Sequence, residues 1–250
     1  MPTIRFTGKI VPMRPPHEIG SLKPFTWEHI DTGERDSYEV SFDGAIVIVD
    51  VVLNYEPREE IISQYRHTAL ELATTALNIV CFAEGMGLTL YLDRCVWPDG
   101  KEEITLPGDD RLKSLVSITN IDIPVMSAML AGDQQLSRPL NDLILAITWP
   151  NAAAINCARA VEGLRHHMNP NEGDKRGESW KRFQEQLNIS QAFRTSITEI
   201  STQPRHGNTT FIPSKDTEDA IMKSWTIMNR YFHYLALGKI QLDPNIFELL

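Results

Sequence analysis

The stretch that decides the fold of the first half of the chain is residues 37–55, SYEVSFDGAIVIVDVVLNY. It is rich in β-branched and aromatic residues, which favour strands, and Asp43 and Gly44 interrupt it near the middle. An Asp-Gly dipeptide is typical of tight hairpin turns because both positions tolerate positive φ. The stretch therefore predicts two antiparallel strands joined at Asp43 and Gly44.

Further strand-like runs surround this hairpin: IRFTGKIV (4–11), FTWEHID (25–31) and LTLYLDRCVW (88–97). Between the hairpin and the last run, residues 57–87 change to helical spacing, with Pro57 suited to a helix start and Gly85 to its end. We predict an α+β protein whose N-terminal domain, residues 1–122, packs an antiparallel β-sheet on one long helix.

The second half predicts helices throughout, as an all-α domain of residues 123–250. Helical segments are expected at SRPLNDLILAITWP (137–150), NAAAINCARAVEGLRHHM (151–168), SWKRFQEQLNI (179–189), SQAFRTSITEIST (190–202) and about residues 215–237. In the last of these, apolar residues recur at steps of three and four and predict a buried stripe: Ile221, Trp225, Met228, Phe232 and Leu235.

Composition and cysteine usage predict a folded cytoplasmic protein without metal or cofactor. Hydrophobic residues make up 42% of the 250 residues and charged residues 23%, as in ordinary globular domains. The start MPTIRFTGKI lacks the apolar core of a signal peptide, and every apolar run ends before membrane-spanning length. Cys81, Cys95 and Cys157 are widely spaced and form no CxxC motif, which predicts reduced thiols. No phosphate-binding glycine motif occurs.

The net charge of −9 is unevenly distributed along the chain. Residues 1–150 carry 12 Lys and Arg against 22 Asp and Glu, whereas residues 151–210 carry 8 against 6. A strongly acidic segment repels nucleic acid. The acidic N-terminal domain is therefore expected to meet a protein partner, and a polyanion is expected only at the basic residues of the second segment.

Residues 202–210, TQPRHGNTT, hold the candidate site. Pro204 interrupts the preceding helix, and Gly207 with Asn208 allows a left-handed backbone, so Arg205 and His206 could simply neutralise helix carbonyls in a capped turn. Contact with an RNA phosphate and catalysis are the two alternatives to this structural interpretation.

Residues 151–238 resemble the HEPN superfamily. The resemblance lies in ARAVEGLRHHM (158–168), SWKRFQEQLNIS (179–190), PRHGN (204–208) and the long final helix. Members of the superfamily are small helical bundles that act as RNA-cleaving toxins, antiviral effectors, or noncatalytic RNA-binding and dimerisation modules. The resemblance implies an accessory or sensor protein of a bacterial defence or toxin-type system, with RNA bound at the C-terminal domain and a homodimer formed through the C-terminal helices.

One departure separates this chain from catalytic HEPN members, which place an arginine and then four to six residues before the histidine. Counting back from His206, the arginine positions hold Glu199, Ile200 and Ser201. Arg159 and His166 have the required spacing, but about one such pair is expected by chance in a chain of this composition.

Arg205 and His206 are therefore the only candidates for a metal-independent ribonuclease, and efficient cleavage is not expected. The predicted binding residues are Arg159, Glu162, Arg165, Arg194, Arg205, His206 and Asn208. Arg159 and Glu162, three residues apart, are also expected to form an ion pair. The alternative function is a noncatalytic protein-interaction and dimerisation module.

Overall fold

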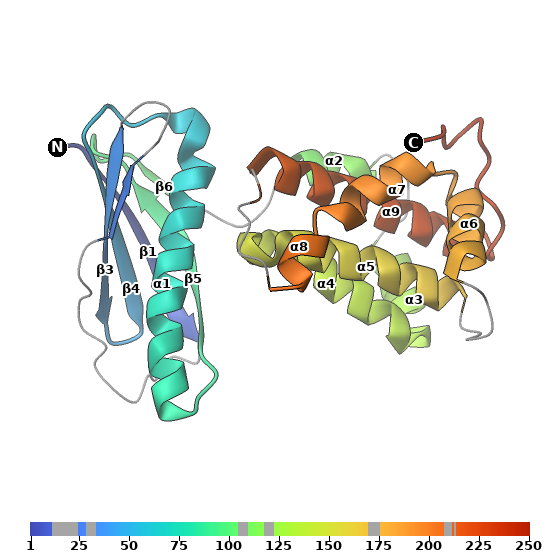
Figure 1. Cartoon of the computed structure of the whole chain (residues 1–250), viewed down its shortest axis with the longest axis horizontal. Coiled ribbons are helices and arrows are strands. Elements are labelled where there is room, and N and C mark those ends of the chain that lie inside the picture. The colour runs from blue at the N-terminus through green and yellow to red at the C-terminus, as the bar shows by residue number, and fades with distance from the viewer. Residues whose placement is uncertain are drawn as a thin grey trace. The chain divides into compact units, whose positions relative to one another are not determined.

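The computed structural model describes residues 1–11, 25–28, 34–104, 110–117, 123–169, 176–207, 212 and 214–250. The chain divides into two compact units, residues 1–106 and residues 107–250. The first unit holds the β-sheet and one long helix, and the second is helical (Figure 1). The predicted α+β class is thereby confirmed.

The sheet of the first unit has the strand order β2-β3-β4-β1-β5-β6, with every neighbouring pair antiparallel. Its strands are β1 (Thr3–Val11), β2 (Phe25–Glu28), β3 (Arg35–Asp43), β4 (Ile46–Leu53), β5 (Thr89–Val96) and β6 (Glu102–Ile104). Strands β3 and β4 form the predicted hairpin, in which Asp43 pairs with Ile46 and Gly44 has a φ of 57°.

The long helix α1 (Ile62–Glu84) follows the short 3-10 turn η1 (Glu59–Ile61) and connects β4 to β5, covering one face of the sheet (Figure 1). Alternate residues of β1 point into the core that the sheet shares with this helix, among them Ile4, Phe6 and Ile10. Helix α1 ends where predicted, at Gly85, whose φ of 64° is left-handed.

Gly8 occupies the same inward face of β1, at a point where the register with β5 shifts. A Cβ on this residue would lie 1.7 Å from the backbone oxygen of Tyr91. The sheet can therefore close between β1 and β5 only because residue 8 has no side chain.

The second unit consists of helices, and its elements are α2 (Asp110–Ser117), α3 (Ile123–Gly132), η2 (Gln134–Leu136), α4 (Ser137–Thr148), η3 (Pro150–Ala152), α5 (Ala153–Met168), α6 (Arg176–Leu187), α7 (Gln191–Glu199), α8 (Thr202–Arg205) and α9 (Ser214–Ala236). Helix α5 packs against α4 and α9 and is buried around most of its circumference. Ser190 caps α7, accepting a hydrogen bond from the backbone N–H of Phe193 at 3.1 Å.

The structure divides the chain at 106/107, earlier than the 122/123 boundary that the sequence predicts. Helix α2 belongs to the second unit because it packs on α9. The Asn229 Nδ2 donates to the backbone oxygen of Leu115 at 3.3 Å, and Arg111 forms an ion pair with Glu218.

The buried face of α9 is rotated away from the predicted apolar stripe. Met228 and Phe232 are buried, but Ile221, Trp225 and Leu235 are only partly buried. The core-facing side also includes Ala220, Ile227, Tyr231 and Tyr234. The prediction from the sequence did not find this rotation because it left Tyr231 and Tyr234 out of the apolar pattern. All three cysteines are buried and unpaired, as predicted.

Candidate anion-binding site

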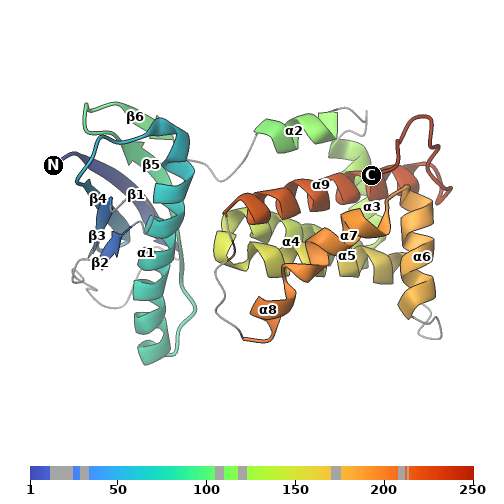
Figure 2. The ribbon, with the colours of Figure 1, turned by 45° about the horizontal axis from the view of Figure 1, so that its top comes forward.

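Four helices of the second unit bring together most of the predicted binding residues. Helix α5 packs against α6, α7 and α8, and Figure 2 shows α7 leading into α8 beside α5. We call the resulting group of side chains the arginine cluster; it consists of Arg165 from α5, Arg176 from α6, Arg194 from α7 and Arg205 from α8. Glu162 of α5 and Trp180 of α6 are its two shared contacts.

Glu162 is the carboxylate of the cluster. Its Oε1 lies 3.2 Å from Nη1 of Arg205 and 3.7 Å from Nη2 of Arg176. The predicted ion pair between Arg159 and Glu162 is not formed, since Arg159 instead pairs with Asp142 of α4 at 3.1 Å. One carboxylate therefore serves two guanidinium groups, which leaves an excess of positive charge.

Trp180 is the aromatic contact of the cluster. The guanidinium carbon of Arg165 lies 4.9 Å from its ring centroid and that of Arg194 lies 4.6 Å away. Both distances fall within the range of cation–π attraction. Trp180 is only 7% exposed, so it is a core residue of the second unit.

Arg165 is nearly buried, at 7% exposure, and is held by polar neighbours. Its Nη1 donates to the hydroxyl of Ser179 and its Nη2 to Nε2 of His166, both at 2.7 Å. A guanidinium has no acceptor, so the Nε2 of His166 must accept, and this ring carries its proton on Nδ1.

Electrostatics make the cluster receptive to an anion. Burial lowers the pKa of Arg165 and of Arg194, and the nearby charge of Arg176 lowers both further. Glu162 raises the pKa of Arg165, and Glu199 followed by Glu162 raises that of Arg194. The Nε atoms of Arg165 and Arg194 are buried without a hydrogen-bond partner in the described part of the chain. A bound anion would offset the mutual repulsion of these groups.

The structure places His206 outside this arrangement. It caps the short helix α8, where its backbone N–H donates to the backbone oxygens of Thr202 and Gln203 at 3.3 and 3.1 Å. Gly207 follows with a φ of 76°, the left-handed backbone that the sequence predicts. Pro204, however, lies inside α8, and the side chain of Arg205 pairs with Glu162. The side chain of His206 is exposed, and Asn208 lies outside the described residues.

Sequence reasoning missed Arg176, which begins α6 after a polar segment and carries no periodic signal. Arg159 was included, yet its ion pair is with Asp142 outside the cluster. The side chains of Arg159 and His166, which have the formal spacing, bind different partners, Asp142 and Arg165.

A second polar group consists of Asp133, His167 and Tyr231, and the side chain of His167 at its centre is 6% exposed. The Nε2 of His167 lies 2.6 Å from Oδ2 of Asp133, and its Nδ1 lies 2.5 Å from the hydroxyl of Tyr231. The hydrogen bond between His167 and Asp133 lowers the pKa of Asp133, and burial raises the pKa of Tyr231. Tyr231 is 1% exposed, so its hydrogen bond with His167 connects α9 to α5 within the core.

Replacing Tyr231 by Phe should lower the free energy of unfolding by about 1–3 kcal/mol, since a buried ring nitrogen of His167 loses its partner. Urea unfolding measures the loss. Tyr234→Phe is the matched control because this buried tyrosine of the same helix makes no side-chain hydrogen bond to a described residue. Equal losses in the two variants would contradict the assigned role of the hydroxyl.

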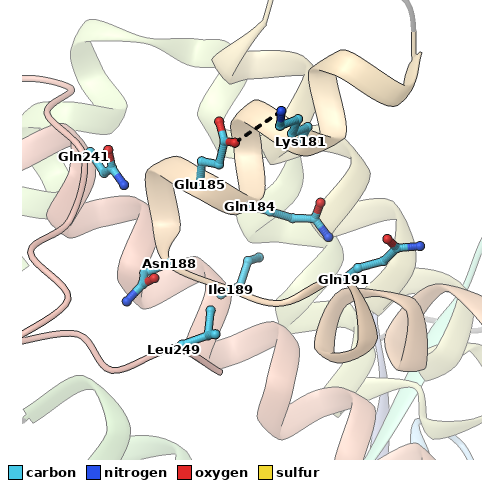
Figure 3. Close-up of a pocket in the computed structure, with 8 residues that line it drawn as sticks. All are labelled: Lys181, Gln184, Glu185, Asn188, Ile189, Gln191, Gln241 and Leu249. Atoms are coloured by element: carbon cyan, nitrogen blue, oxygen red, sulfur yellow. Dashed lines mark ion pairs between the residues drawn. The ribbon is translucent and has the colours of Figure 1, made fainter.

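A separate pocket of about 260 Å³ lies between α6, the start of α7 and the C-terminal segment, and it is open to solvent (Figure 3). Its two charged side chains and Asn188 already have partners within the protein. Lys181 pairs with Glu185 at 3.8 Å, and the amide of Asn188 donates to the backbone oxygen of Phe247. The pocket therefore offers less to a charged ligand than the arginine cluster does.

Within the described residues, no group of three or more His, Cys, Asp or Glu side chains is placed to hold a metal ion. The helices described here include none with the length and apolar character needed to cross a bilayer.

Two protein-family models match the chain, one in each of its two units. Residues 4–106 match the model described as domain of unknown function (DUF8168) N-terminal domain, and residues 123–236 match the corresponding C-terminal domain. No curated protein and no solved structure matches significantly. The first match covers the sheet unit and the second covers α3 to α9, so the chain carries both domains of DUF8168.

Proposed function

We propose that this protein binds RNA as a noncatalytic accessory or sensor component of a bacterial defence or toxin-type system in the cytoplasm. The observation that carries the proposal is the arginine cluster, in which Arg176 and Arg205 share the Glu162 carboxylate and Arg165 and Arg194 share the Trp180 ring. Guanidinium groups suit phosphate because their planar N–H donors match its oxygen atoms. The resemblance of residues 151–238 to the HEPN superfamily supports RNA as the source of that phosphate.

Binding without cleavage is favoured by the surroundings of the two nearby histidines. Cleavage through a 2′-hydroxyl needs a proton-transfer group positioned beside the cation that neutralises the phosphate. The Nε2 of His166 already accepts from Arg165, and Arg205 is paired with Glu162 while the neighbouring His206 is exposed.

The alternative function, protein interaction, is favoured by a separate observation on the acidic sheet unit. Phe82 and Ile79 of α1 are 91% and 63% exposed, and large apolar side chains on a helix surface are typical of docking faces. Homodimerisation through the C-terminal helices stays a prediction from the HEPN resemblance.

The test of RNA binding is fluorescence anisotropy with a labelled single-stranded oligoribonucleotide, measured with and without a 5′-phosphate. Arg194→Met should weaken binding about tenfold, because one charged hydrogen-bond donor is lost. Arg159→Met is the control, since it removes the same charge from α5 outside the cluster. No binding of either RNA by the wild-type protein would contradict the proposal, and cleavage abolished by His206→Ala would contradict its noncatalytic character.

A further inference from the structure

We infer that the arginine cluster recognises the terminal phosphate monoester of an RNA, and that the Glu162 carboxylate is an internal counter-ion with which this phosphate competes. The inference rests on the proposed RNA-binding function and specifies its ligand. The inference states which part of the RNA the cluster binds and which protein residue limits the affinity for RNA.

Among the described residues of α5 to α8, the cations outside the arginine cluster have partners of their own. Arg159 pairs with Asp142, Lys181 pairs with Glu185, and Arg182 donates to the side-chain oxygen of Asn169. A protein that follows a nucleic-acid backbone instead needs a groove of unpaired cations. The cluster therefore fits one phosphate better than a series of phosphates.

A terminal phosphate suits this site better than an internal one. A monoester carries close to two negative charges and three free oxygens, whereas an internal phosphodiester carries one charge and two free oxygens. The cluster presents four guanidinium groups, and Glu162 neutralises only part of their charge. The net charge of −9 also disfavours contact with the rest of a polyanionic strand.

Base recognition is not provided by Trp180, although this aromatic residue lies within the cluster. Its ring is almost fully buried and contacts two guanidinium groups, so no nucleobase can stack on it. Recognition at the cluster therefore depends on the phosphate and is independent of the base of the terminal nucleotide.

Glu162 limits access to the cluster. Its Oε1 accepts from Arg205 at 3.2 Å and lies near Arg176, so an incoming phosphate must take over these donors and approach a negative charge. The repulsion by Glu162 and the attraction to the arginines both scale with the charge of the phosphate. Glu162→Gln should therefore strengthen binding of every RNA form, and it should strengthen binding of a dianionic terminal phosphate most.

The experiment compares four probes in fluorescence anisotropy with the full chain: one oligoribonucleotide sequence with a 5′-phosphate, with a 3′-phosphate or with hydroxyl groups at both ends, and inorganic phosphate as competitor. We expect at least one phosphorylated end to bind about tenfold more tightly than the hydroxyl form. Glu162→Gln should bind the hydroxyl form several-fold more tightly than the wild type does.

The outcomes separate this inference from the proposed function. Equal binding of all three RNA forms would overturn the terminal-phosphate inference and leave RNA binding intact. No binding of any form would overturn both. Inorganic phosphate that binds as tightly as the phosphorylated RNA would assign the site to free phosphate instead. Unchanged or weaker binding by Glu162→Gln, in a variant that melts at the wild-type temperature, would overturn the role of Glu162.

Discussion

A variant with both Arg176→Met and Arg205→Met is expected to bind 5′-phosphorylated RNA at least about a hundredfold more weakly than the wild type. Hydrogen bonds to charged groups contribute about 1.5–3 kcal/mol each, and two are lost. Folding should be nearly unaffected, because both arginines lie at the surface and, within the described part of the chain, form ion pairs with Glu162 alone. Exposed ion pairs of this kind stabilise proteins by about 0–1 kcal/mol.

The matched control is the double variant Arg159→Met and Lys181→Met, which removes the same charge from α5 and α6. These two residues pair with Asp142 and Glu185, outside the arginine cluster. Anisotropy titrations of the two double variants at equal salt concentration compare their affinities directly. If the control loses as much affinity as the cluster variant, general electrostatic attraction would explain binding and the cluster would not be its site.

Gly8→Ala is expected to destabilise the sheet unit by about 3 kcal/mol or more, the upper range for overpacking in a rigid environment. Its Cβ would lie 1.7 Å from the backbone oxygen of Tyr91, and a backbone atom of a neighbouring strand cannot rotate away. To relieve the clash, β1 and β5 must separate at the centre of the sheet. The core beneath them would then be exposed.

Hydrogen exchange measured by mass spectrometry would localise the effect of Gly8→Ala. Protection should fall across residues 1–106 and stay unchanged in α5 and α9, because the two units have separate cores. Gly87→Ala is the control, since no atom lies within 4 Å of the position of its added Cβ. Wild-type protection in Gly8→Ala would show that the sheet adjusts easily at this position.

Local sequence patterns determined the elements that depend on near neighbours. The hairpin at Asp43 and Gly44 needs only a turn that accepts positive φ between two strand-forming runs. Helix α1 needs only a change to helical spacing and an end at Gly85, and the cap at Ser190 acts within one turn. Each of these signals is complete within a few residues, so the fold class could be predicted.

Features that depend on distant segments required the tertiary structure. Helix α2 belongs to the second unit because it packs on α9, more than a hundred residues later in the chain. The need for glycine at position 8 arises from β5, which approaches only after the chain has passed through α1. No local pattern around either segment contains this information.

The candidate site divides in the same way. The basic residues of the helical half could be named from the sequence, and Glu162, Arg165, Arg194 and Arg205 do meet in space. Their partners could not be named, because residues at one spacing on a helix can face different neighbours: Arg159 lies against α4 and Glu162 lies against α8. Charge and residue type are properties of the sequence, whereas the choice of ion-pair partner depends on which helices pack side by side.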